Sequence, residues 1–231
     1  MTSWSDEFLP RLTARVGAVA DPTRAEAMAS YMRDQFAFAG IPTPARVQLS
    51  REALAGMAAP TEADLVDTTD RAWARHEREY QYVACWLLKR RDRLLTSATL
   101  PAAQRWITTK SWWDTVDGLA QHTVGGIVRR DRSLDPTMAA WLVDDNIWLA
   151  RAAILHQERW GVDTEPEWLF HACLTRAGDP EFFLRKAIGW ALRSYSYVDA
   201  DAVERFVRDH DAELSGLSKR EALKAIERAR R

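Results

Sequence analysis

The sequence predicts an all-α protein made of many short amphipathic helices. Apolar residues recur at intervals of three and four, as at Ile147, Ala150 and Ile154, which is the spacing of one face of a helix. No stretch alternates convincingly between apolar and polar residues, and no Asn-Gly or Asp-Gly turn separates two alternating runs. Strands are therefore not expected.

Helix start signals recur along the chain, where a capping side chain precedes a first-turn proline or opens a capping box. In chain order they are Asp21-Pro22, Thr43-Pro44, Thr61 with Asp64, Asp135-Pro136, Asp179-Pro180, Asp201 with Glu204, and Ser218 with Glu221. We count roughly twelve helices with short connections, and pairs of them would form units of about 35 to 40 residues. Such units stack into a HEAT-like helical-repeat solenoid with a long concave face. A compact irregular helical bundle is the alternative.

The chain is expected to form one domain over residues 1–231, because no Gly/Ser-rich or Pro-rich linker divides it. No run of about 18 apolar residues is present, so a membrane span is not expected. The first residues lack a secretion signal, which favours a cytoplasmic location. Cys85, Cys173 and the five histidines show no ligand spacing, so we expect free buried thiols, no metal and no cofactor.

The charge distribution is more informative than the net charge of −1. The segment from Cys85 to Arg132 contains nine Lys/Arg and four Asp/Glu, whereas the segment from Asp135 to Phe170 contains two Arg and seven Asp/Glu. The net charge argues against a crudely basic nucleic-acid binder, but a local excess can form a positive face on a neutral protein. Solvated helix faces often show the same asymmetry.

The segment Lys110–Asp117, Lys-Ser-Trp-Trp-Asp-Thr-Val-Asp, combines two tryptophans with two carboxylates. Trp113 and Asp117 are four residues apart, so they share one face of a helix. A carboxylate beside a large aromatic ring is costly to bury unless it has a partner or a chemical role. A core tryptophan next to a salt-bridged aspartate explains the segment equally well. Asp114 is turned about 100° from Asp117 on the helix and is expected to cap the helix or pair with Lys110.

Residues 110–117 and three further segments, at 31–41, 148–157 and 185–193, carry a resemblance when read together. The segment at 185–193 is Arg-Lys-Ala-Ile-Gly-Trp-Ala-Leu-Arg. These runs and their separations resemble the HEAT-like-repeat DNA glycosylases for alkylated purines, the AlkD type of DNA alkylation repair enzyme. The resemblance extends from about Ala27 to about Ala222.

The resemblance implies that Asp117 is the catalytic carboxylate and that Trp113 and Trp190 are two aromatic walls. It also implies that Arg151 contacts phosphate and that Tyr31 lies at the pocket. The remaining expected DNA contacts are Thr43, Arg46, Lys110, Lys186 and Arg193. Without the resemblance, periodicity would place Trp190 in the core, and Arg151 would be a surface or ion-pair arginine.

Family relatives cleave N3- and N7-alkylated purines from duplex DNA without flipping the lesion out of the helix. The chemistry suits a single carboxylate: an alkylated purine is cationic and departs neutral, so the general acid of ordinary glycoside hydrolysis is not needed. We therefore expect a monomeric, monofunctional DNA glycosylase that releases 7-methylguanine and 3-methyladenine from double-stranded DNA in the bacterial cytoplasm, associated with the nucleoid. No lysine matches a catalytic position, so no lyase step is expected.

Two alternatives from other classes are a non-catalytic helical scaffold for damaged DNA or protein, and an enzyme that cleaves another N-glycosidic bond, such as that of a free nucleoside. No base-reading polar motif supports the nucleoside enzyme.

Overall fold

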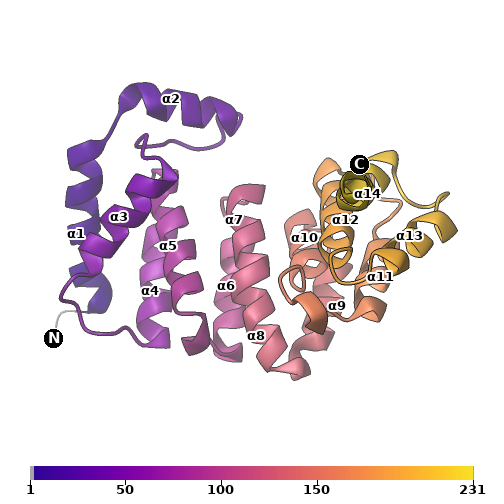
Figure 1. Ribbon diagram of the computed structural model, residues 1–231. Helices are drawn as coiled ribbons and strands as arrows, with labels where there is room; N and C mark the ends of the chain where they lie inside the picture. Colours follow the sequence, from indigo (N-terminus) through magenta and orange to yellow (C-terminus); the bar gives the residue numbers. More distant parts are fainter. Residues whose placement is uncertain (1–2, 231) are drawn as a thin grey trace. The chain divides into compact units, whose positions relative to one another are not determined.

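A computed structural model describes residues 3–230, which fold into fourteen α-helices with no strand among them (Figure 1). The chain divides into two compact units, Met1–Ala102 and Ala103–Arg231. Within each unit the helices pack mainly against helices one or two positions away in the sequence, as in stacked helical repeats. The all-α helical-repeat class is confirmed, and the single domain over residues 1–231 stays a prediction.

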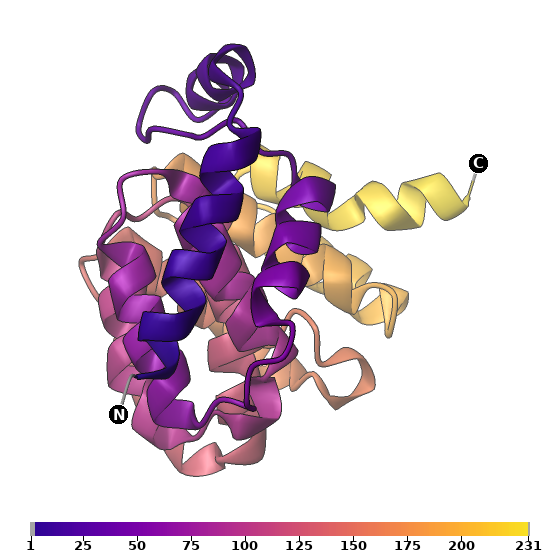
Figure 2. The same cartoon turned by 90° about the vertical axis from the view of Figure 1, so that its left-hand side faces the viewer.

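The first unit contains five complete helices and the start of a sixth. They are α1 (Trp4–Val19), α2 (Pro22–Tyr31), α3 (Thr43–Leu54), α4 (Glu62–Trp73), α5 (Arg78–Arg90) and the beginning of α6 (Leu100–Thr108), with 3-10 turns at Asp92–Leu94 and Ser97–Thr99. Helix α1 packs against α3 and α4, and α4 packs against α5 (Figures 1 and 2). Their shared core contains Phe8, Leu12, Leu65 and Leu87.

The buried carboxylate of Glu79 anchors the loop that joins α2 to α3. Its Oε2 accepts the N–H of Ala39 at 2.9 Å, and its Oε1 accepts those of Gly40 and Ile41 at 3.0 and 3.1 Å. Gly40 has a φ of +81°, and a Cβ there would lie 2.1 Å from the Asp21 carbonyl oxygen, so this position requires glycine. Helix α2 has no buried residue and so contributes little packing. The loop after it is therefore held mainly by Glu79, in the first turn of α5.

We predict that Glu79→Ala destabilises the protein by about 2 to 4 kcal/mol, because the substitution leaves two buried and one partly buried backbone N–H groups without their acceptor. Urea denaturation measures the loss. Glu77→Ala, two residues earlier at the start of the same helix, is the matched control, since the Glu77 side chain makes no capping hydrogen bond. Equal unfolding midpoints for the two variants would contradict the anchoring role.

The second unit contains the end of α6 and the other eight helices. They are α7 (Trp113–Gly118), α8 (Gly125–Arg130), α9 (Asp135–Leu142), α10 (Ile147–Leu155), α11 (Pro166–Thr175), α12 (Phe182–Tyr195), α13 (Ala200–Asp209) and α14 (Gly216–Ala229), with a π-helical segment at Leu119–Val124 and 3-10 turns at Arg132–Leu134 and Gly161–Asp163. Helix α10 packs against α7, α9 and α12, and α12 lies along α14. These contacts place three helices with predicted site residues, α7, α10 and α12, side by side.

Two of the seven predicted helix starts are confirmed. Asp21 Oδ1 accepts the N–H of Arg24 at 3.0 Å, and Thr61 forms a capping box with Asp64. The other five are wrong by one to three residues; the observed N-caps are Pro42, Leu134, Glu181, Asp199 and Ser215. At Asp199 and Ser215 a capping side chain two or three residues earlier accepts the N–H instead, whereas Pro42, Leu134 and Glu181 make no side-chain capping hydrogen bond. The helix count also exceeds the expected number, partly because the π-helical segment separates α7 from α8.

Neither Cys85 nor Cys173 forms a disulfide, and only Cys173 is buried, so the prediction of two buried thiols is wrong for Cys85. Within residues 3–230 no cluster of three or more His, Cys, Asp or Glu side chains is arranged to hold a metal ion. In the same part of the chain, every helix is too short or too polar to cross a membrane.

Candidate active site

Asp117 lies near the end of the short helix α7, directly before the π-helical segment that begins at Leu119. Its side chain is largely buried, with 13% exposed. Trp113 is the first residue of α7, one turn before Asp117, and is half-buried. Short π-helical segments inside α-helices occur frequently at functional sites, because the wider turn changes the direction in which side chains leave the helix.

Arg151 on α10 forms a two-point ion pair with Asp117. Its Nε donates to Oδ1 at 2.7 Å and its second terminal nitrogen, Nη2, donates to Oδ2 at 2.7 Å. The remaining nitrogen, Nη1, donates to the carbonyl oxygen of Phe183 on α12. The Arg151 side chain is 1% exposed. The ion pair is thus one of the roles that the sequence allowed for Arg151, and its contact with phosphate stays a prediction.

The surroundings of Asp117 act on its charge in opposite directions. Burial raises the pKa of the Asp117 carboxyl above its ordinary value, and this is the largest influence. The charge and the hydrogen bonds of Arg151 act to lower the pKa, while the neighbouring Asp114 raises it slightly. Arg151 therefore supports an ionised carboxylate in a place where water stabilises it poorly.

Trp190 on α12 lies beside this ion pair. The guanidinium carbon of Arg151 is 5.5 Å from the centroid of the Trp190 ring, and Lys186 Nζ and the guanidinium carbon of Arg193 are 5.6 and 5.9 Å away. Trp190 is half-buried, unlike the buried core tryptophans Trp106 and Trp141. Its position differs from the core placement that periodicity alone predicts.

The sequence does not single out an aromatic cluster that contacts Arg151 through Phe183. Trp112, Trp148 and Phe183 pack with ring centroids 4.9 to 5.8 Å apart, and all three are half-buried. Phe183 also supplies the third acceptor for Arg151. The spacing of Trp148 three residues before Arg151 is the signal that could have identified it, because such residues share a helix face.

Lys186 and Arg193 both form ion pairs with Glu221 on α14, at 2.7 and 2.5 Å. The sequence predicts that Glu221 forms a capping box with Ser218. That assignment is wrong because α14 begins one turn earlier, with the Ser215 hydroxyl accepting the Ser218 N–H. Lys110 lies between α6 and α7 with a φ of +51°. The second unit thus brings Asp117, Arg151, Trp190, Lys186 and Arg193 into one connected group.

The other predicted DNA contacts belong to the first unit. Thr43 is the first residue of α3, and its hydroxyl accepts a hydrogen bond from Arg46 at 3.2 Å. The guanidinium of Arg46 also lies 4.4 Å from the ring centroid of Tyr82. Tyr31, the last residue of α2, has 72% of its surface exposed. Within this unit Thr43 and Arg46 are brought together.

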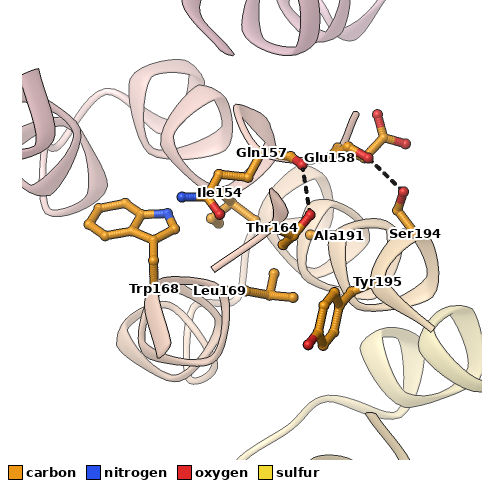
Figure 3. Close-up of a pocket in the computed structure, with 9 residues that line it drawn as sticks. All are labelled: Ile154, Gln157, Glu158, Thr164, Trp168, Leu169, Ala191, Ser194 and Tyr195. Atoms are coloured by element: carbon orange, nitrogen blue, oxygen red, sulfur yellow. Dashed lines mark hydrogen bonds between the residues drawn. The ribbon is translucent and has the colours of Figure 1, made fainter. Parts of the chain in front are cut away.

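A separate small cavity lies among α10, α11 and α12. It is lined by Ile154, Gln157, Glu158, Thr164, Trp168, Leu169, Ala191, Ser194 and Tyr195 (Figure 3). Its volume of about 10 Å³ suits at most a single water molecule and excludes a nucleotide. Glu158 Oε2 and Trp168 Nε1 are buried and find no hydrogen-bond partner within residues 3–230. Burial raises the pKa of the Glu158 carboxyl. This cavity is not a substrate site.

The protein is therefore a helical-repeat protein whose candidate site combines a buried carboxylate, its arginine partner and nearby tryptophans. Comparison with known proteins identifies its family. The sequence matches the family described as DNA alkylation repair enzyme over residues 12–226, and the chain belongs to that family. A similar solved structure is a predicted DNA alkylation repair enzyme from Enterococcus faecalis, with 32% identity and a TM-score of 0.81. The match covers 89% of this chain and 95% of that one. No curated protein matches the sequence.

We predict that Arg151→Gln destabilises the protein by about 3 to 5 kcal/mol near neutral pH, because it leaves the buried Asp117 carboxylate without its cation. Arg151 acts to lower the pKa of Asp117, so the variant's Asp117 takes up a proton at higher pH than the wild type's. Protonation removes the buried charge. The difference in free energy of unfolding between the wild type and Arg151→Gln should therefore be largest at neutral pH and should decrease as the pH falls.

Urea denaturation of both proteins between pH 7 and pH 4 measures this difference. Arg159→Gln is the control, since Arg159 is exposed and lies eight residues after Arg151, beyond the end of α10. A difference that stays constant with pH would contradict the pairing as its source.

Proposed function

We propose that the protein is a monofunctional DNA glycosylase that removes cationic N3- and N7-alkylated purines from duplex DNA and leaves an abasic site. Membership of the DNA alkylation repair family supports alkylation repair as the setting. The observation that carries the reaction type is the buried Asp117 carboxylate, held by Arg151 beside the ring of Trp190.

The reaction follows from the charge of the substrate. When the purine carries an alkyl group on N7 or N3, its bond to C1′ of the sugar breaks with both electrons going to the base, which departs neutral. Positive charge develops on the sugar, and a water oxygen then bonds to C1′ and loses a proton. No group has to protonate the base, which distinguishes this reaction from ordinary glycoside hydrolysis.

Asp117 would stabilise the developing cation, and one preorganised charged group of this kind contributes about 3 kcal/mol. The faces of Trp113 and Trp190 would add attraction of roughly 0.5 to 2 kcal/mol each. An unmodified purine gains little, because its departure as an anion is not assisted by the site. Selectivity for charged lesions then requires no reading of base edges.

Arg151 has two roles in this proposal. It keeps Asp117 ionised and fixes the direction of the carboxylate through two hydrogen bonds. Its second proposed role, contact with the phosphate of the lesion, requires the guanidinium, which is 1% exposed, to become accessible when DNA binds. Tyr31, Thr43, Arg46, Lys110, Lys186 and Arg193 are proposed to contact the DNA, mostly at its backbone, which fixes register without carrying sequence information. The protein is proposed to work as a monomer on chromosomal DNA in the cytoplasm.

Free 7-methylguanine should appear when the protein is incubated with methylated duplex DNA, and chromatography measures it. Asp117→Asn should lower the single-turnover rate on the order of a hundredfold, because the substitution removes the charge that opposes the sugar cation. Asp114→Asn, three residues earlier on the same helix, is the matched control and should retain most of the rate. No release by the wild type, or undiminished release by Asp117→Asn, would refute the proposal.

A non-catalytic scaffold for damaged DNA is a second candidate, because a two-point buried ion pair such as Asp117–Arg151 can also be purely structural. The two functions differ in what they should bind. A glycosylase should bind duplex DNA that contains a cationic abasic-site analogue more tightly than undamaged duplex, since an enzyme is complementary to its transition state. Fluorescence anisotropy at constant salt measures both affinities, and equal values would favour the scaffold.

A further inference from the structure

We infer that Glu221 is a positioning residue for Trp190, whose indole ring it fixes from the neighbouring helix α14. The inference rests on the proposed function, in which Trp190 forms one wall for the cationic sugar. Glu221 touches neither Asp117 nor Arg151 in the contacts described above, so any effect on the reaction has to pass through the side chains that it holds.

Three donors from α12 converge on the Glu221 carboxylate. Its Oε2 accepts the indole N–H of Trp190 at 3.2 Å and an N–H of Arg193 at 2.5 Å, and its Oε1 accepts Lys186 Nζ at 2.7 Å. The Glu221 side chain is only 13% exposed. Because two of the donors are charged and hold the carboxylate on both sides, the acceptor of the Trp190 N–H has a defined position.

Gly189, the residue before Trp190, allows α14 to approach α12 closely enough for Glu221 to reach the indole N–H. A Cβ at Gly189 would lie 2.5 Å from Cβ of Glu221 and 2.9 Å from the carbonyl oxygen of Ser218. The Ser218 hydroxyl donates to the carbonyl oxygen of Arg185 at 2.9 Å, one turn away on α12. The missing side chain at Gly189 and this hydrogen bond set the register between the two helices.

The cations around the Trp190 ring keep Glu221 ionised. Three cations, Arg151, Lys186 and Arg193, lie within 5.9 Å of the Trp190 ring centroid. Burial acts to raise the pKa of Glu221, but Lys186 and Arg193 outweigh it and hold the pKa below its ordinary value. An ionised Glu221 carries one negative charge against the two positive charges of Lys186 and Arg193, so it stays paired with both and keeps the acceptor of the indole N–H in place.

Single-turnover release of 7-methylguanine tests the inference in the full-length protein. Glu221→Ala should slow release by about tenfold to a hundredfold, the loss expected when a wall of the site shifts. Glu221→Gln should lie between Ala and the wild type, because the amide oxygen can still accept the indole N–H. Glu227→Ala is the matched control, since Glu227 is an exposed glutamate on the same helix.

The double variant separates an effect through Trp190 from a general loss of structure. Phenylalanine at position 190 keeps a ring but has no N–H to donate, so adding Glu221→Ala to Trp190→Phe should slow release little further. If Glu221→Ala slows the Trp190→Phe protein as much as it slows the wild type, the inference is wrong. An unchanged rate for Glu221→Ala alone would also overturn it.

A second measurement does not depend on activity. In a ¹⁵N spectrum of the indole N–H groups, the Trp190 signal is the one that disappears in Trp190→Phe. In Glu221→Ala this signal should shift and exchange faster with solvent, while in Glu227→Ala it should not. An unmoved signal overturns the inference even if the wild type releases no base, a result that would refute the proposed function separately.

Discussion

The buried pair between Asp117 and Arg151 is the interaction on which the candidate site depends. Both members leave water almost completely, and this is tolerable only because each oxygen of the carboxylate receives a hydrogen bond from the guanidinium. The third bond of Arg151, to the Phe183 carbonyl oxygen, extends the pair from α7 and α10 to α12. One arginine therefore connects the three helices that carry the proposed catalytic residues.

A second ionic group also contacts Trp190. Glu221 accepts hydrogen bonds from Lys186, Arg193 and the indole N–H, so the ring contacts two ion-paired clusters with one carboxylate in each. This arrangement suits a reaction that creates positive charge, because aromatic faces and fixed anions attract a cation. Such side chains have defined positions before substrate arrives, which lowers the reorganisation required during the reaction.

The sequence predicts the helical class and a set of candidate site residues, but these two predictions rest on different kinds of signal. Helical spacing around Ile147 and the lack of alternating runs are local signals, so they identify the class directly. The grouping of Asp117, Arg151 and Trp190 came from the resemblance to a family. Glu221 could not be assigned correctly, because its partners lie 28 to 35 residues away in the sequence and its spacing from Ser218 imitates a capping box. Ser215 and Ser218 are both serines that can cap a helix, so the local sequence does not decide between them, and α14 begins at Ser215.

The most direct test of the central claim, that an ionised and poorly hydrated Asp117 stabilises a sugar cation, is the pH dependence of single-turnover 7-methylguanine release. Enzyme-free DNA provides the correction for spontaneous loss of base. The rate should fall as the pH is lowered and Asp117 becomes protonated, with a midpoint above the ordinary aspartate value of 3.8, since the pKa of Asp117 is raised. Asp117→Asn should be slow at every pH and lack this titration. A wild-type rate that does not change with pH through that range, or an identical profile for Asp117→Asn, would contradict the claim.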